Sequence, residues 1–133
     1  MAVSCDDLFE LATQLAAAEK SESDRRAAVS RAYYAVYHCA IRFHERLPSQ
    51  GLPPSRGGTH VQLSHALSNP TVRDKELRTM SRRIGYLCQD LHGKRVIADY
   101  RLHENVSSQD VEQAIAQARQ VFKLAESTDD SSH

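Results

Sequence analysis

Two side chains of this sequence, Arg31 and His38, combine residue types and a spacing that suit chemistry on a phosphate. If the segment around them is helical, they lie about two turns apart on one face, with Tyr34 between them. A histidine titrates near neutral pH and can transfer a proton, whereas an arginine stays charged and can stabilise a phosphate in a transition state. RNA cleavage needs little beyond such a pair, because the ribose 2′-hydroxyl is itself the nucleophile. We therefore predict Arg31 and His38 as catalytic residues and Tyr34 as a binding residue.

The same residues also suit a structural role. Buried polar groups are normally hydrogen-bonded, so Arg31 and His38 equally fit contacts with neighbouring helices around a bundle core. Tyr33, Tyr34 and Tyr37 could stack on bases or on a partner, but aromatic residues at helical spacing more often fill a core. Spacing alone leaves both interpretations open.

A basic strip on a later predicted helix is a second candidate for contacts with RNA or with an acidic partner. Arg78 and Arg82 lie one turn apart on the same face, so we predict both as binding residues. Asp74 and Glu76 lie in the same segment. An ordinary solvated helix face therefore explains the pattern at least as well.

No metal or cofactor site is predicted. His60 and His65 are five residues apart, and His44 lacks the second histidine of a zinc protease helix. The 3 cysteines are widely spaced and form no CxxC pair. Gly57 and Gly58 are not followed by the Lys-Ser or Lys-Thr pair of a phosphate-binding loop.

The composition indicates one domain without a bulk affinity for nucleic acid. A chain of 133 residues has a common size for a single domain, and its formal net charge is +0. Contact with RNA therefore requires a local patch. The N-terminal segment is acidic where a signal peptide needs basic residues, and Arg31 interrupts the longest apolar run. With the unpaired cysteines, these features predict a reduced, cytoplasmic protein that does not enter a membrane.

Hydrophobic residues recur at steps of three and four along most of the chain, which predicts an all-α fold. The segments Ser21–Asp24 and Ser107–Asp110 are typical of helix N-caps. We expect helices over Asp6–Ala18, from the first cap to Leu47, over Thr59–Leu67, over Val72–Leu91, and from the second cap to Ala125.

The remaining segments are predicted to connect these helices. Pro48–His60 is rich in proline, glycine and serine and is predicted as a loop. Gly93 weakens the fourth helix, and we interpret Lys94–Val106 as a helix end that runs into an ordered connection. The prediction is an up-and-down bundle of four long helices and a possible short fifth, with residues 1–126 as one domain and 127–133 as a flexible tail.

Three segments together resemble a known family. In chain order they are SRAYYAVYHCA (Ser30–Ala40), KRVIADY (Lys94–Tyr100) and AIAQARQVF (Ala114–Phe122). They are similar to the HEPN domain, a helical fold named for higher eukaryotes and prokaryotes nucleotide-binding. The likeness extends from about Ser23 to Glu126 and is greatest to the small stand-alone prokaryotic branch.

The resemblance implies an HEPN-like bundle that pairs as a homodimer and is often encoded beside a minimal nucleotidyltransferase, in toxin-antitoxin or defence systems. Many members are metal-independent endoribonucleases whose arginine and histidine, four to six residues apart, come from both subunits. Arg31 and His38 have six residues between them. The second segment adds Arg95, Asp99 and Tyr100 as binding residues.

Two functions of different classes follow from these residues. The first is a dimeric endoribonuclease toxin that cleaves RNA with Arg31 and His38. The second is a non-catalytic HEPN module that binds a nucleotidyltransferase antitoxin, a nucleotide or RNA. In the second case the same polar residues fix the helix packing.

Overall fold

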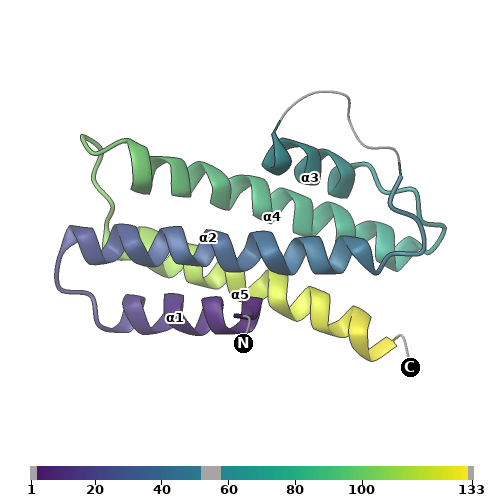
Figure 1. The fold of residues 1–133 in the computed structure, drawn as a ribbon, viewed down its shortest axis with the longest axis horizontal. Coiled ribbons are helices and arrows are strands. Elements are labelled where there is room, and N and C mark those ends of the chain that lie inside the picture. The colour runs from purple at the N-terminus through teal and green to yellow at the C-terminus, as the bar shows by residue number, and fades with distance from the viewer. Residues whose placement is uncertain (1–2, 52–57, 132–133) are drawn as a thin grey trace.

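The computed structural model describes residues 3–51 and 58–131, with side chains described as far as Ser127. This part of the chain consists of helices and contains no strand, which confirms the predicted all-α fold class. The helices are α1 (Cys5–Ala17), α2 (Glu22–Glu45), α3 (Thr59–Ser68), α4 (Lys75–Tyr100) and α5 (Ser108–Ser131). Figure 1 shows the long helices side by side, with successive long helices running in opposite directions, and α3 as the short additional helix.

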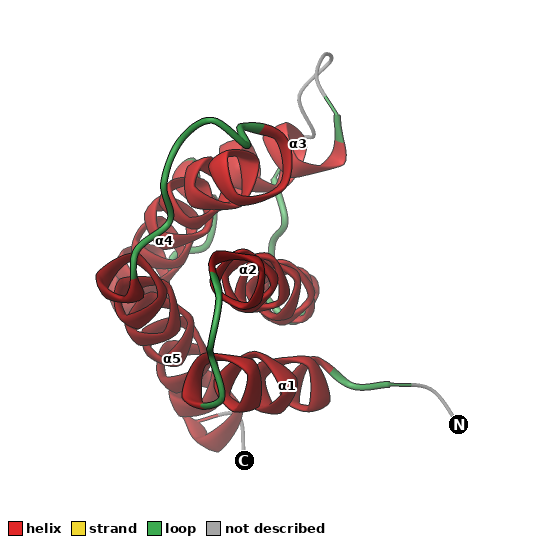
Figure 2. Cartoon of the chain, turned by 90° about the vertical axis from the view of Figure 1, so that its left-hand side faces the viewer, coloured by secondary structure: helices red, strands yellow, loops and turns green. Residues whose placement is uncertain are grey.

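The central element is α2. It packs against α1, α4 and α5, and Figure 2 shows these helices arranged around one side of it. Its packed face consists largely of small, fully buried side chains, namely Ala28, Ala32, Ala35, Cys39 and Ala40. Small residues let neighbouring helices approach closely, so three of them fit around α2. On the other side of α2, Ala27 and His38 are exposed and Arg31 and Tyr34 are half-buried. We call these four residues the open face of α2.

Both predicted N-caps are confirmed. The Ser21 hydroxyl accepts a hydrogen bond from the backbone N–H of Asp24 at 3.2 Å, at the start of α2. Before α5, the Ser107 hydroxyl accepts from the N–H of Asp110 at 3.1 Å, and the Asp110 carboxylate accepts from the N–H of Ser107 at 2.8 Å. Each cap satisfies backbone donors that lack a partner within the helix.

The helix predicted over Val72–Leu91 begins at Lys75 and continues without a break through Gly93 to Tyr100. The segment Lys94–Val106, interpreted as a helix end that runs into an ordered connection, is helical as far as Tyr100 and not beyond it. Leu91 and Ala98 are buried and extend the apolar face beyond the glycine. Gly93 is exposed, and a Cβ added there meets no atom within 4 Å. Burial of the apolar face therefore outweighs the modest helix penalty of one solvent-facing glycine.

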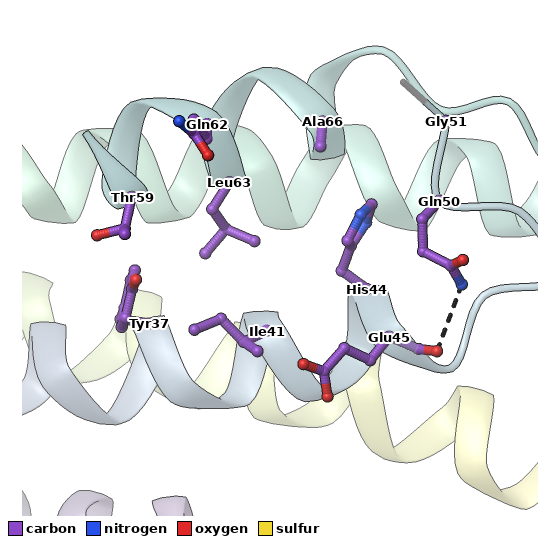
Figure 3. Close-up of a pocket in the computed structure, with 10 residues that line it drawn as sticks. All are labelled: Tyr37, Ile41, His44, Glu45, Gln50, Gly51, Thr59, Gln62, Leu63 and Ala66. Carbon is purple, nitrogen blue, oxygen red and sulfur yellow. Dashed lines mark hydrogen bonds between the residues drawn. The ribbon is translucent and has the colours of Figure 1, made fainter. Parts of the chain in front are cut away.

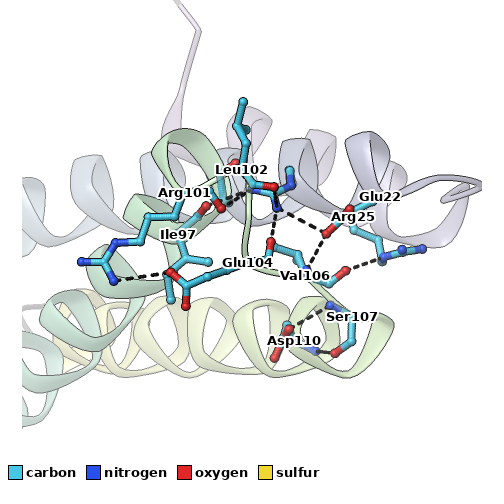
Figure 4. Close-up of polar contacts among 11 residues, drawn as sticks. Glu22, Arg25, Ile97, Arg101, Leu102, Glu104, Val106, Ser107 and Asp110 are labelled. Carbon is cyan, nitrogen blue, oxygen red and sulfur yellow. Dashed lines mark hydrogen bonds and ion pairs between the residues drawn. The ribbon is translucent and has the colours of Figure 1, made fainter.

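The C-terminal end of α4 is fixed by Arg26 of α2. Figure 4 shows the connection that follows α4, with Val106 beside Glu22 of α2. Arg26 donates hydrogen bonds to backbone carbonyls between residues 97 and 104, namely those of Ile97 (3.0 Å), Ala98 (3.0 Å), Arg101 (3.3 Å), Leu102 (3.4 Å) and Glu104. Glu22 pairs with Arg26 at 3.3 Å and also accepts from the N–H of Val106 at 2.8 Å. These contacts add side-chain donors to the carbonyls at the helix end, two of which, Ile97 and Arg101, also accept from backbone N–H groups. They hold the α4–α5 connection against α2.

The short helix α3 is held mainly by α4. A Cβ added at Gly85 would lie 3.0 Å from the Cβ of Leu67 and 3.1 Å from the hydroxyl oxygen of Ser68, so a larger residue would force α3 to shift by a few tenths of an ångström. One turn earlier on α4, the buried Ser81 hydroxyl donates to the carbonyl of Leu67 at 2.7 Å. The two contacts fix the C-terminal end of α3.

Apart from those of α4, the ends of most elements differ from the predicted limits by one to a few residues, and the difference is largest at the end of α5. α5 extends to Ser131, beyond residue 126 where the sequence predicted the start of a flexible tail, and residues 132–133 lie outside the described part. The predicted loop Pro48–His60 overlaps the start of α3 at Thr59, and its residues 52–57 lie outside the described part. Among the described residues, no helix has both the length and the apolar composition needed to cross a membrane.

The two glycines of α4 provide a paired test of this packing. We expect Gly93→Ala to stabilise the protein by about 0.5–1 kcal/mol, because the added Cβ meets open space and raises helix propensity. We expect Gly85→Ala to destabilise it by about 1–3 kcal/mol, because the added Cβ overlaps α3. Urea unfolding followed by circular dichroism measures both, and equal shifts in the same direction would contradict the close approach of α3 and α4.

Candidate functional site

The open face of α2 carries a stacked row of polar and aromatic side chains. The Arg31 guanidinium lies over the Tyr34 ring, 4.8 Å from its centroid. The rings of Tyr34 and His38 are stacked with centroids 6.3 Å apart and planes 18° apart. The predicted catalytic residues and Tyr34 thus lie in the order Arg31, Tyr34, His38 along one face of the helix.

The end of α4 adds a second cation to this row. Arg95 donates from Nε to the Asp99 carboxylate at 2.8 Å, and the Ser30 hydroxyl of α2 donates to the same carboxylate oxygen at 3.0 Å. The Arg95 guanidinium lies 5.9 Å from the centroid of the Tyr34 ring and 5.2 Å from that of Tyr100. Two sequence segments far apart in the chain therefore meet at one surface. We call Arg31, Tyr34, His38, Arg95 and Tyr100 the aromatic–cation strip.

The strip has the components of a stacking surface for planar ligands. The Tyr34 ring lies near two guanidinium groups, Tyr100 is 67% exposed, and His38 is exposed. Arginine and aromatic planes stack on nucleobases, and guanidinium groups bind phosphate oxygens. Within one chain, however, Arg31 and His38 are about 10 Å apart along the helix axis, which is too far for both to act on one phosphate.

Two predicted binding residues, Arg78 and Arg82, do not join this strip. Arg78 donates to the backbone carbonyls of Val72 (3.3 Å) and Arg73, so its guanidinium closes the turn before α4. Arg82 is exposed on α4, about 20 Å along the helix from Arg95. Asp99 is brought to the strip, where it holds Arg95 and Ser30 together.

Beside the strip is a partly buried cluster that the sequence analysis did not identify. The Tyr33 hydroxyl and Nδ1 of His60 are hydrogen-bonded at 2.8 Å. The His60 and His92 rings are stacked with centroids 3.5 Å apart and planes 15° apart, and the His92 ring meets the Tyr33 ring edge-on at 5.3 Å. The three residues come from α2, α3 and α4, so the sequence offers no local spacing that reveals the cluster.

Burial controls the protonation of this cluster. Burial, followed by the nearby His92 and Arg95, lowers the pKa of His60 to about 4. The pKa of His92 is lowered by burial and by Arg95, and burial raises the pKa of Tyr33. Two positive imidazolium rings at stacking distance would repel each other and Arg95. The folded protein therefore favours the neutral form of both histidines.

The described residues offer no obvious place for a metal ion. No group of three or more histidine, cysteine, aspartate or glutamate side chains in this part of the chain is arranged to hold one. Cys5, Cys39 and Cys88 are buried free thiols. Burial raises the pKa of both Cys39 and Cys88 to about 12, which disfavours the reactive thiolate.

Comparisons with known proteins identify no relative: no family model matches the chain, and neither do the curated proteins nor the solved structures. The functional argument therefore depends on the residues themselves and on their geometry.

The His60 cluster makes stability depend on pH in a specific direction. The ordinary pKa of histidine is 6.5 and that of His60 in the folded protein is about 4, so between these values the unfolded chain binds more protons. The free energy of unfolding should therefore fall as the pH falls through this range. On acidification from pH 7.5 to pH 5, we expect the urea midpoint of His60→Gln to fall less than that of the unchanged protein. Some fall should remain, because the pKa values of His92 and His44 are also lowered.

The control for this measurement is His65→Gln, which changes an exposed histidine of the same helix. We expect it to retain the acid sensitivity of the unchanged protein. If His60→Gln and His65→Gln lose stability equally on acidification, the cluster does not cause the effect.

Proposed function

We propose that this protein binds single-stranded RNA through the aromatic–cation strip. The observation that carries the proposal is that the guanidinium groups of Arg31 and Arg95 lie 4.8 Å and 5.9 Å from the centroid of the Tyr34 ring. Unpaired bases stack on aromatic and guanidinium planes, while the same arginines neutralise the neighbouring phosphates. The formal net charge of the chain is +0, so a local strip of this kind has to supply the attraction.

The HEPN resemblance supports a homodimeric form of this protein in the cytoplasm, within a toxin-antitoxin or defence system and with a minimal nucleotidyltransferase as its antitoxin partner. As an alternative to RNA stacking on Tyr34, which such a contact would cover, the uncovered open face of α2 suits a symmetric contact between two chains (Figure 2). A two-fold axis passing near Tyr34 would set two α2 helices antiparallel, so that one chain's Arg31 lies beside the other chain's His38. Such an arrangement removes the separation of about 10 Å between the two residues within one chain.

A second candidate function follows from this pairing. Because His38 is exposed on the same helix face as Arg31, a dimer can present an arginine and a histidine to one phosphate from opposite chains. In this form the protein is a metal-independent endoribonuclease. His38 would transfer the proton of the 2′-hydroxyl, and Arg31 would stabilise the phosphate in the transition state.

RNA binding is tested by fluorescence anisotropy with a labelled single-stranded RNA at low and moderate salt. We expect Tyr34→Ala and Arg31→Ala each to weaken binding about tenfold, from the loss of one stacking plane or one phosphate contact. The control is Arg82→Ala, which removes an exposed arginine outside the strip. Binding that is lost in Arg82→Ala and retained in Tyr34→Ala would place the RNA on the other basic strip and overturn the proposal.

Cleavage is tested separately by incubating the purified protein with structured and single-stranded RNA in EDTA. If the protein is an endoribonuclease, we expect chelator-resistant cleavage that falls at least a hundredfold in Arg31→Ala and in His38→Ala, as for loss of a general acid–base group. Circular dichroism of each variant shows whether the bundle is still folded. Absence of cleavage at any protein concentration, with binding intact, would leave the non-catalytic HEPN module as the function.

A further inference from the structure

A groove separates α2 from the short helix α3, on the far side of Tyr37 from the strip. Its volume is about 310 Å³, within the size range of small-molecule sites. Figure 3 shows Ile41 of α2 and Leu63 of α3 facing each other across it. Branched aliphatic side chains on two opposing walls suit a flat or extended apolar group between them.

Apart from Gln62, which lies beside Leu63, the polar groups of the groove lie at its two ends. The hydroxyl-bearing Tyr37 and Thr59 are at one end, and His44, Glu45 and Gln50 are at the other (Figure 3). Gln50 is held there by a hydrogen bond from its Nε2 to the backbone carbonyl of Glu45 at 3.3 Å. A ligand that fills the groove therefore has an apolar middle and polar ends.

The charged side chains that line the groove determine whether a cationic or an anionic ligand of this shape is favoured. Its described lining residues include one carboxylate, Glu45, and neither lysine nor arginine. The nearby Arg42 of α2 is paired with Asp6 of α1 at 4.0 Å. Burial lowers the pKa of His44, so this imidazole is neutral at pH 7 and does not offset the carboxylate. The groove therefore attracts cations and repels anions.

His44 lies at this end of the groove with an unpaired ring nitrogen. Its Nδ1 atom is buried and has no hydrogen-bond partner among the described residues. Leaving a buried polar atom unpaired costs free energy. Because this atom is closed to solvent, the contact of a ligand at this end depends on the exposed side chain of Glu45.

We propose that the groove between α2 and α3 binds a small amphipathic amine. Its protonated amino group lies at the end formed by His44, Glu45 and Gln50, and its apolar body lies between Ile41 and Leu63. The site uses none of the strip residues and does not depend on RNA binding. Because Glu45 repels phosphate, the groove does not continue the path of an RNA backbone.

The test compares three probes that share a phenyl ring and differ in charge: 2-phenylethylamine, 2-phenylethanol and phenylacetate. Binding to the full chain is measured by ligand-observed NMR and by the imidazole nitrogen shifts of His44, without RNA. We expect the amine to bind about fivefold or more tightly than the alcohol, as for one partly exposed charge pair with a hydrogen bond, and the acid to bind most weakly.

Two variants locate the site. Glu45→Gln should reduce the affinity for the amine to that for the alcohol, because it removes the charge and retains the shape. Ala66→Leu should abolish binding of both, because it fills the groove from α3. The matched control is Ala116→Leu at an exposed position of α5, which should leave binding unchanged. Circular dichroism confirms that each variant is folded.

The proposal is overturned if phenylacetate binds as tightly as the amine, if Ala66→Leu retains amine binding, or if none of the probes binds at millimolar concentration. Arg31→Ala and Tyr34→Ala should leave amine binding intact. Loss of RNA binding and loss of amine binding are thus separate results.

Discussion

The contact of Arg26 with the end of α4 determines how α2 and α4 meet. One guanidinium group donates to five backbone carbonyls between residues 97 and 104, of which those of Ile97 and Arg101 also accept from backbone N–H groups. Hydrogen bonds from a charged donor are stronger than those between neutral groups, so five of them tie this connection to α2. The contact therefore fixes both where α4 ends and where that end lies along α2.

This register positions the candidate site. One turn beyond Arg26, the Ser30 hydroxyl reaches Asp99, and one further turn along α2, Tyr34 meets the guanidinium of Arg95. A shift of one helical turn, about 5.4 Å, would separate all these partners. The aromatic–cation strip therefore depends on a backbone contact at the helix end that contains none of the strip residues.

The helix α2 serves the core and the strip because its two faces differ in composition. Small residues such as Ala32 and Cys39 are fully buried between three helices, while Arg31 and His38 lie on the side that these helices leave uncovered. This arrangement differs from the structural alternative raised from the sequence, in which Arg31 and His38 would bond to neighbouring helices. Among the proposed site residues, Asp99 has that structural role, because it links Ser30 and Arg95.

The periodic spacing of apolar residues determined the helical class, the approximate number of helices and the N-caps at Ser21 and Ser107, because these depend on contacts within a few residues. It also placed Arg31, Tyr34 and His38 on one face. Only the tertiary structure decided that α4 continues past Gly93, that Arg95 lies against Tyr34, and that His60 and His92 stack. These features depend on packing between helices distant in the chain, where burial and carbonyl satisfaction outweigh local propensity.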